Sequence, residues 1–266
     1  MDGEQRRSRS VERALTLLLA VAQHREPIGV SDLARQTGLS KSTVHLSLQT
    51  MRQFGFVEQE DGSDRYLLGL QAAQLGAQAL DVSPVVSWVA PGMRRLAERS
   101  GEAVSLGIRA DRAVVFVKRY ETAHRLGTSI TVGSQMPMHA SASGKCLLSG
   151  LPDGEIEELY PDDVLPSQST NTIRARSALF DELAEVRKRG YAFNTDEFVD
   201  GISAAAIPVH LGERVVAALS IAGPTTRFQA EDWLTDLHEV LDPRGTRADG
   251  PHLSPTGHTT EEVGNP

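Results

Sequence analysis

The 266-residue sequence contains a single cysteine, Cys146. One cysteine cannot form an internal disulfide, which agrees with a reducing compartment. The chain also has no apolar run of about 18 residues, and no apolar core with a small-residue cleavage site follows its polar N-terminus. These absences argue against a membrane span and against a secretory signal. We therefore expect a cytoplasmic protein without a membrane partner.

The residue patterns of metal and hydrolase sites are largely missing. The eight histidines include no HxH or HExxH pair, so we predict no metal site. No GxSxG nucleophile elbow surrounds either of the candidate serines, so we predict no catalytic residue. A hydrolase stays as the enzymatic alternative, because residue types for nucleophilic or acid–base work are supplied by His139, Ser141, Ser143, Asp196 and Glu197.

One short segment, Ser143-Gly144-Lys145-Cys146, resembles the end of a phosphate-binding loop. That motif requires glycine where this chain has His139 and serine or threonine where it has Cys146, so we reject it. We expect Lys145 near a helix start, either salt-bridged or solvated, and Cys146 as a small buried hydrophobic side chain. No cofactor is predicted.

Composition and charge define the class of protein. Hydrophobic residues make up 40% of the chain and charged residues 23%, which is typical of a soluble globular protein. The formal net charge of -8 opposes binding to nucleic acid, because phosphate neutralisation supplies most non-specific affinity. However, residues 1–70 hold nine basic and nine acidic residues, and Leu33 to Val57 contains three basic residues and no carboxylate. An anionic duplex could approach this window.

Three consecutive helix patterns, with a glycine turn at Gly38, occupy the N-terminal part of the chain. Each pattern follows a serine, whose hydroxyl can cap the first turn of a helix. The second and third patterns together predict a helix-turn-helix. The predicted helices are Val11 to Gln23 after Ser10, Asp32 to Thr37 after Ser31, and a third that follows Ser40 and ends at about Gln53.

The third predicted helix has a core side and a free side. Val44, Leu48 and Met51 recur at helical spacing and are expected to face the core, which leaves the opposite face free. A free face of this kind is what a DNA recognition helix needs. The predicted DNA contacts are Lys41, Ser42, Thr43, His45, Leu46, Gln49 and Arg52 on this helix, and Arg65 on the hairpin that follows.

A hairpin and a further helix come next. Phe56 to Gln59 and Arg65 to Leu68 flank a turn rich in Asp and Gly, which predicts the wing of a winged helix-turn-helix. This wing is acidic, so we expect little DNA contact from its tip. Leu70 to Leu80 carries small side chains that would let a helix pack closely on a partner. We expect a linker helix that also dimerises the chain.

The C-terminal part alternates between paired strand patterns and blocks of helix, after a break that Pro84 and Pro91 are expected to bracket. Such an order predicts an α+β domain with a mostly antiparallel sheet flanked by helices. The predicted strands are Ala103 to Arg109, Ala113 to Tyr120, Ser129 to Val132, Ala204 to His210 and Arg214 to Ile221. The predicted helices are Trp88 to Arg99, Ala140 to Ser149, Asp153 to Tyr160 and Arg174 to Arg189.

Several segments occur in the order found in one family. They are Leu39 to Val44 at the start of the recognition helix, Tyr66 to Gly69 at the end of the wing, Gly133 to Ser141 with Gly144-Lys145, Arg189 to Ala192, Gly201 to Val209, and Ala218 to Pro224. From Ser10 to about Leu241 the sequence resembles the IclR-type bacterial transcriptional regulators. The resemblance implies a GAF-like effector domain, assembly into dimers or tetramers, and control of metabolic operons by a small organic acid or related metabolite.

The resemblance also implies where the effector binds. The implied pocket residues are Ala142, Ser143, Asn194, Ala204, Ser220 and Ala222, and the segment Ala140 to Gly144 adds Gly144. Unpaired backbone N–H groups at this helix start could hold a carboxylate without any arginine. Relatives that bind small keto acids tend to have an acid, a cysteine and a second serine where this chain has Asn194, Ala204 and Ala222. The pocket therefore favours an aromatic or longer-chain acid.

These expectations divide the chain into five parts. Leu253 and Val263 are the only large aliphatic residues after Asp242, so the tail is expected to be disordered. The predicted parts are a disordered N-terminus (1–9), the winged helix-turn-helix (10–69), the linker and dimerisation helix (70–83), the effector domain (84–241) and the disordered tail (242–266).

The recognition helix departs from the family at one point, where Leu46-Ser47 replaces the common Arg-Leu. Either Leu46 packs on a thymine methyl group and contributes to the choice of DNA sequence, or leucine at this position costs affinity for DNA and the chain tolerates that cost. We favour the second alternative.

One recognition helix covers few base pairs, so we expect a palindromic or near-palindromic double-stranded operator bound by a homodimer or a dimer of dimers. Repression is favoured over activation. The alternative is a small-molecule sensor that does not read DNA.

Overall fold

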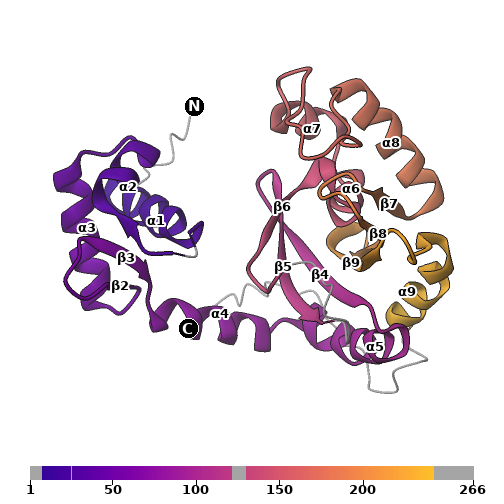
Figure 1. Ribbon diagram of the computed structural model, residues 1–266, viewed down its shortest axis with the longest axis horizontal. Helices are drawn as coiled ribbons and strands as arrows, with labels where there is room; N and C mark the ends of the chain where they lie inside the picture. The colour runs from indigo at the N-terminus through magenta and orange to yellow at the C-terminus, as the bar shows by residue number, and fades with distance from the viewer. Residues whose placement is uncertain (1–7, 25, 122–129, 243–266) are drawn as a thin grey trace, which may run out of the picture. The chain divides into compact units, whose positions relative to one another are not determined.

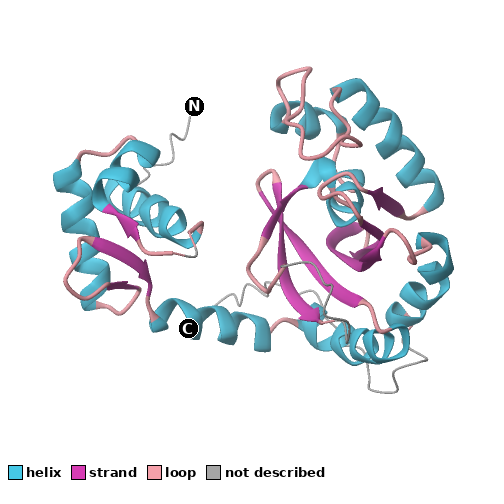
Figure 2. Ribbon diagram, viewed as in Figure 1, coloured by secondary structure: helices cyan, strands magenta, loops and turns pink. Residues whose placement is uncertain are grey.

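The computed structural model describes residues 8–24, 26–121 and 130–242. The chain divides into two compact units, Met1–Ser83 and Pro84–Pro266. Figure 1 labels their helices and strands in chain order, and Figure 2 shows that both units combine helices with a sheet. Within the described ranges, no helix is long and apolar enough to span a membrane.

The first unit packs three helices against a small sheet. Its core is formed by fully buried side chains that include Leu17, Val44, Leu48 and Tyr66, so the apolar spacing predicted for the third helix is confirmed. The sheet has the strand order β1-β3-β2. Its elements are α1 (Arg9–Ala22), β1 (Ile28–Gly29), α2 (Val30–Thr37), α3 (Lys41–Gln53), β2 (Val57–Gln59), β3 (Arg65–Leu68) and α4 (Leu70–Asp81).

Two of the three predicted serine caps are wrong. The first helix begins at Arg9 after Ser8, and α2 begins at Val30 after Gly29, without a side-chain cap in either case. The reason for α2 is that Ile28 pairs with Tyr66 of β3, so the chain leaves the sheet at Gly29 and turns directly into the helix. At α3 the prediction is confirmed, because the Ser40 hydroxyl accepts the first-turn N–H at 3.2 Å.

The second unit is built on one antiparallel sheet. Every strand pair is antiparallel and the strand order is β6-β5-β4-β9-β8-β7, which confirms the α+β class. The elements are α5 (Pro84–Ser100), β4 (Ala103–Ala110), β5 (Ala113–Tyr120), β6 (Gln135–Pro137), a short 3-10 turn η1 (Met138–Ala140), α6 (Ala142–Ser149), α7 (Asp153–Leu159), α8 (Arg176–Arg189), β7 (Ala192–Thr195), β8 (Ile202–Leu211), β9 (Arg214–Pro224), η2 (Ala230–Trp233) and α9 (Leu234–Leu241).

Helices cover both faces of this sheet (Figure 1). Helices α6 and α8 share a core with Ala206 of β8 and Ala218 of β9, and therefore lie on one face. Helices α5 and α9 pack together on the other face. They approach so closely that a β-carbon on Gly92 would lie 2.9 Å from the Val240 side chain. The alternation of side chains along each strand thus supplies two cores, one on each side of the sheet.

Several predicted boundaries in this unit need correction. Pro84 and Pro91 do not bracket a break, because α5 begins at Pro84 and continues through Pro91. Proline at the first helical position is favourable, since its missing N–H has no intrahelical partner there, and buried neighbours hold the helix together around Pro91. Strand β6 lies at Gln135–Pro137, and the predicted third strand does not form at residues 130–132; Ser129 lies outside the described residues.

Other differences concern helix starts and short elements. Helix α6 begins at Ala142 instead of Ala140, and α8 at Arg176 instead of Arg174. Strands β1 and β7 and helix α9 were not predicted, because pairing and packing partners far along the chain stabilise these short segments. The disorder predicted for 1–9 and 242–266 falls largely outside the described residues; Arg9 itself is helical.

Candidate functional site

The exposed face of α3 presents most of the predicted DNA contacts. Because Val44, Leu48 and Met51 are buried, the residues between them point away from the core. Leu46 is the most exposed apolar side chain of this helix, at 69% of its full surface. Thr43 is half-buried, and the exposed members of the predicted set are Lys41, Ser42, His45, Leu46, Gln49 and Arg52.

Two of the predicted DNA-contacting arginines are also tied to the protein. The Arg52 guanidinium donates to Gln59 Oε1 at 2.7 Å, and Gln59 Nε2 donates to the carbonyl oxygen of Ser63 at the same distance. Arg65 Nε donates to the carbonyl oxygen of Pro27 at 2.8 Å. Arg52 therefore connects α3 to the wing, and both arginines are held in place before any ligand arrives.

A cavity of about 640 Å³ lies in the second unit between the sheet and the start of α6. The structure brings six of the seven predicted effector residues to its wall: Ala142, Ser143, Asn194, Ala204, Ser220 and Ala222. Their positions follow from register, since Ala204 pairs with both Asn194 and Ala222 and therefore shares one face of the sheet with them. Apolar side chains that include Phe116, Met136 and Phe198 complete the wall.

Gly144 is the predicted residue that does not belong to this wall. Its N–H already donates to the Ser141 hydroxyl at 3.1 Å, so the expectation that this amide is unpaired is wrong. A β-carbon here would lie 2.2 Å from the Met138 carbonyl oxygen, which means that glycine permits a close backbone approach. Gly144 therefore sets how η1 packs on α6, whereas Ala142 and Ser143 line the cavity.

The Asn194 side chain connects two segments of the second unit through hydrogen bonds. Its Nδ2 donates to the carbonyl oxygen of Ala140 at 3.0 Å, and its Oδ1 accepts the N–H of Glu197 at 3.0 Å. These bonds use both ends of the amide and connect the start of α6 to the loop after β7. Asn194 thus lines the cavity and also holds two segments of its wall together.

Sequence reasoning missed two arginines in the cavity. The Arg119 side chain is 3% exposed, and its guanidinium donates to the Ser105 hydroxyl at 2.8 Å and to Glu121 Oε1 at 2.9 Å. Arg227 also lines the cavity, and its Nε donates to Glu102 at 2.8 Å. The cavity wall therefore carries two arginines in addition to the residues that the sequence singled out. A hairpin register that pairs Ser105 with Arg119 was the signal that could have revealed the first of them.

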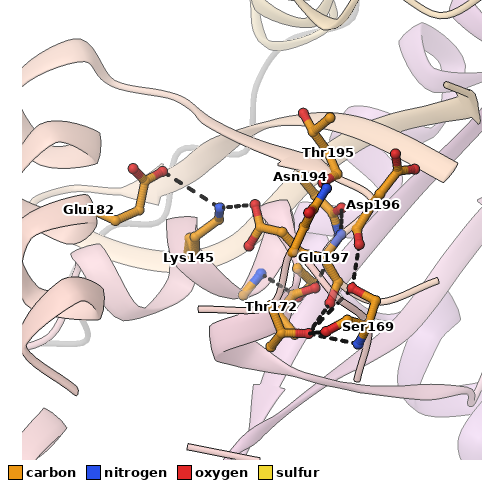
Figure 3. A network of polar contacts seen from close by, with 12 residues as sticks. Lys145, Ser169, Thr172, Glu182, Asn194, Thr195, Asp196 and Glu197 are labelled. Carbon is orange, nitrogen blue, oxygen red and sulfur yellow. Dashed lines mark hydrogen bonds and ion pairs between the residues drawn. The ribbon is translucent and has the colours of Figure 1, made fainter. Parts of the chain in front are cut away.

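A buried ion pair anchors another wall of the cavity (Figure 3). Lys145 of α6 is fully enclosed, and its Nζ lies 2.7 Å from Glu197 Oε1 and 3.6 Å from Glu182 Oε1. Burial raises the pKa of Glu197, and the nearby Lys145 charge opposes that shift. Of the two outcomes expected for Lys145, salt-bridged and solvated, the first is correct.

The backbone beside Glu197 is held as well. Thr172 donates its hydroxyl to the Glu197 carbonyl oxygen at 2.6 Å, and the Ser169 hydroxyl donates to the carbonyl oxygen of Asp196 (Figure 3). Asp196 has a φ of 57°, in the left-handed region. The loop continues as 198–201, and all four of these residues line the cavity. Its conformation is therefore set by Lys145 and by the loop before α8.

Cys146 is fully buried, as expected, and its thiol donates to the Ala206 carbonyl oxygen at 3.3 Å. Burial raises the pKa of the thiol to about 12. Because only the thiolate reacts, we expect Ellman's reagent at pH 8 to label the native protein about a thousandfold more slowly than the unfolded chain. One thiol should then react on addition of denaturant, and Cys146→Ser should show no labelling in either state. Rapid stoichiometric labelling of the native protein would contradict the burial.

Comparisons with known proteins identify the family. Residues 77–244 match the model of the bacterial transcriptional regulator IclR C-terminal domain, and residues 10–61 match the IclR helix-turn-helix domain. The acetate operon repressor of Salmonella typhimurium is 33% identical over 235 residues, which cover 87% of this chain and 85% of the repressor.

Solved structures give the same result. An IclR transcriptional regulator from Alicyclobacillus acidocaldarius is 26% identical with a TM-score of 0.77, covering 90% of this chain and 97% of its own. An IclR homologue from Microbacterium hydrocarbonoxydans, in complex with 4-hydroxybenzoate, is 25% identical with a TM-score of 0.70. The match covers 85% of this chain and 95% of the homologue's chain.

The matched family and relatives are transcriptional regulators and not enzymes, so the hydrolase alternative is wrong. The helix-turn-helix match likewise excludes the alternative of a small-molecule sensor that does not read DNA. The chain is a DNA-binding transcriptional regulator, and it belongs to the IclR family.

Proposed function

We propose that a homodimer, or a dimer of dimers, of this chain binds a palindromic or near-palindromic operator in the cytoplasm through α3. We further propose that a small organic acid in the cavity modulates this binding, with repression as the default effect. The observation that carries the proposal is the combination of a free α3 face in one unit with a cavity of about 640 Å³ in the other. Ligand pockets commonly have this size.

The linker helix supports the dimer. No residue of α4 is buried, and even its leucines are accessible: Leu70 is 67% exposed and Leu75 is 47% exposed. Apolar side chains on a helix with no buried face are stabilised when a second copy covers them. A two-fold dimer presents two recognition helices, and the DNA site then acquires the same symmetry.

The DNA-binding side is assigned to α3, because no carboxylate occurs from Leu33 to Val57. Lys41 and Ser42 stand at the helix start, where the N-terminal end of a helix favours phosphate. The acidic wing tip should contribute little. Arg52 and Arg65 are assigned mainly to phosphate contact, since their protein partners fix their orientation.

The effector is assigned to the space between α6 and strands β8 and β9. The amides of Ala142 and Ser143 belong to the first turn of α6, where N–H groups have no intrahelical partner and can hold a carboxylate. Ala204 and Ala222 leave apolar room for the body of the ligand. This favours an aromatic or longer-chain acid over one of two or three carbons. The Microbacterium homologue, with its bound 4-hydroxybenzoate, is a relative with an acid of this class.

The operator assignment is tested by footprinting and by salt titration on DNA upstream of the regulated genes. Two symmetry-related protected half-sites are expected. Affinity should fall by about a thousandfold or more between about 50 and 200 mM salt, if the dimer makes at least about six phosphate contacts. One unpaired half-site, or an affinity that does not change with salt, would refute the proposal.

Leu46→Arg is expected to tighten binding to all DNA sequences and to steepen the slope of log K against log salt by about one unit. The reason is that Leu46 is 69% exposed on the proposed DNA-facing side and offers no hydrogen bond. Leu46→Gln is the matched control. Glutamine introduces a polar side chain without a charge, so this variant should leave the slope unchanged. A selection from random DNA that returned a new consensus for Leu46→Arg would instead show that Leu46 contributes to sequence choice.

A further inference from the structure

An arginine lies in the cavity wall beside a serine hydroxyl. Ser105 of β4 pairs in register with Arg119 of β5, and both residues line the cavity. Arg119 Nη1 donates to the Ser105 hydroxyl at 2.8 Å, which places the charged end of the arginine next to the wall. We infer that the Arg119 guanidinium, assisted by the Ser105 hydroxyl, binds the ionised acid group of the effector and makes the cavity select an anion over a neutral ligand of the same shape.

The strand register places this pair on the face of the sheet that α6 covers. Ser105 pairs on its other side with Ser220 of β9, and Ser220 pairs with Ala206 of β8. Side chains paired across neighbouring strands point to the same face, and Ala206 belongs to the core that α6 and α8 share. The Arg119 side chain therefore lies on the cavity side of the sheet, where it is 3% exposed. An ionic contact is screened less at such a buried position than at the surface.

The Ser105 hydroxyl can add a hydrogen bond to this charge. Its oxygen accepts from Arg119, and a hydroxyl that accepts still has one hydrogen to donate. The Ser220 hydroxyl is used differently, because it donates to the Ser105 carbonyl oxygen at 3.4 Å. A ligand carboxylate would therefore meet a guanidinium and one hydroxyl donor, and charge-assisted hydrogen bonds are roughly twice as strong as neutral ones.

The second arginine of the wall, Arg227, is less suited to this role. Its Nε and Nη2 each lie 2.8 Å from Glu102 Oε1, and Glu102 is buried, so that carboxylate offsets the charge with little screening. Arg119 donates to Glu121 Oε1 at 2.9 Å, but Glu121 is 57% exposed and water weakens the attraction. Asp200 adds an exposed carboxylate to the wall. Of the two arginines, Arg119 therefore has the carboxylate partner that competes less with a ligand.

The start of α6 also attracts an anion, and its contribution can be separated from that of Arg119. The end of a helix carries roughly half an elementary charge, whereas a guanidinium carries a whole one. The N–H groups of α6 belong to the backbone, so a substitution at Arg119 leaves them in place. The preference for acids that survives in an Arg119 variant therefore measures the contribution of α6.

Calorimetric titration of the full-length protein with acids and their amides tests this inference, which rests on the proposed function. Benzoate and benzamide have a similar shape and differ in charge, and hexanoate and hexanamide form the aliphatic pair. In at least one pair we expect the acid to bind at least about tenfold tighter than the amide. Arg119→Gln should reduce that advantage to about threefold or less and leave the dissociation constant of the amide within about twofold. Arg119→Lys keeps the charge and should retain an intermediate preference.

Three further variants separate contact with the ligand from support of the wall. Arg109→Gln makes the same change on β4 outside the cavity lining and should retain the preference for the acid. Glu121→Gln removes the exposed carboxylate partner of Arg119 and should retain or increase that preference. If Arg119→Gln fails to fold, Ser105→Ala preserves the test, because it should weaken binding of the acid by about threefold or more and spare the amide.

Four results would overturn the inference. An unchanged preference in Arg119→Gln would leave the binding of acids to α6 alone. Equal losses for acid and amide would show that Arg119 only shapes the cavity, and a loss in Glu121→Gln equal to that in Arg119→Gln would assign the effect to their ion pair. Amides that bind the unmodified protein as tightly as their acids would show that the cavity does not select an anion. If no member of either pair binds, the cavity assignment under the proposed function fails as well.

Discussion

Lys145→Met is expected to destabilise the second unit by about 3–5 kcal/mol, because it leaves the buried Glu197 carboxylate without its partner. Among the described residues, Glu197 Oε2 has no hydrogen-bond partner and Lys145 is the positive charge that pairs with this carboxylate, so most of the compensation for the remaining charge is lost. Methionine has a volume similar to the lysine stem, and packing should therefore change little. Urea unfolding followed by circular dichroism would measure the difference.

Glu197→Gln is the matched variant. Here the buried lysine keeps Glu182 at 3.6 Å, and the amide oxygen can still accept from Lys145, so the loss should be clearly smaller than for Lys145→Met. Equal losses for the two variants would show that the stability comes from packing and not from the charge pair.

The pH dependence of Lys145→Met has a definite sign. Burial raises the folded-state pKa of Glu197, and removing Lys145 removes the charge that lowers it, so the pKa rises further. A raised folded-state pKa means stability that is present below the unfolded pKa and is lost as pH rises through the folded value. The deficit of Lys145→Met should therefore be largest at neutral pH and should narrow toward about pH 5. A deficit that does not change with pH would contradict the role of the carboxylate.

Ala204→Leu and Ala222→Leu are each expected to abolish release of the operator at the effector concentration that releases the unmodified protein. Both alanines are partly accessible and line the cavity, so a larger side chain can enter the space assigned to the ligand without displacing the core. A steric conflict of about 1–3 kcal/mol would weaken effector binding by roughly five- to 150-fold. Gel-shift titration with and without effector would measure the response.

Ala110→Leu is the control for these variants, because it enlarges an exposed alanine at the end of β4, outside the cavity. It should respond to effector as the unmodified protein does. Operator affinity in the absence of effector would be measured for every variant, so that damage to DNA binding is seen separately. If both cavity variants respond at an unchanged effector concentration, the effector does not bind in this cavity.

Features with a local signal could be predicted from the sequence. Val44, Leu48 and Met51 occur at helical spacing, and a helix with that pattern buries one face wherever it lies. Ser40 caps α3 because its hydroxyl needs only the N–H three residues ahead. The pocket set from Ala142 to Ala222 was reached by resemblance to a family and not by local pattern, and six of its seven members line one cavity.

The features that decide how the cavity works have no local signal. Lys145 and Glu197 are 52 residues apart, and Asn194 bonds to a carbonyl 54 residues before it. Arg119 looks like an exposed strand residue until the register places it beside Ser105.

The sequence by itself therefore determined the amphipathic recognition helix and most elements of the sheet, because periodicity and turn residues act over a few positions, and its ordered segments carried the resemblance to the family. Only the tertiary structure decided which polar groups face the ligand and which are used to hold the cavity wall. The reason is that a buried polar side chain must find a partner in space, and the partner is set by strand register and helix packing between segments far apart in the chain.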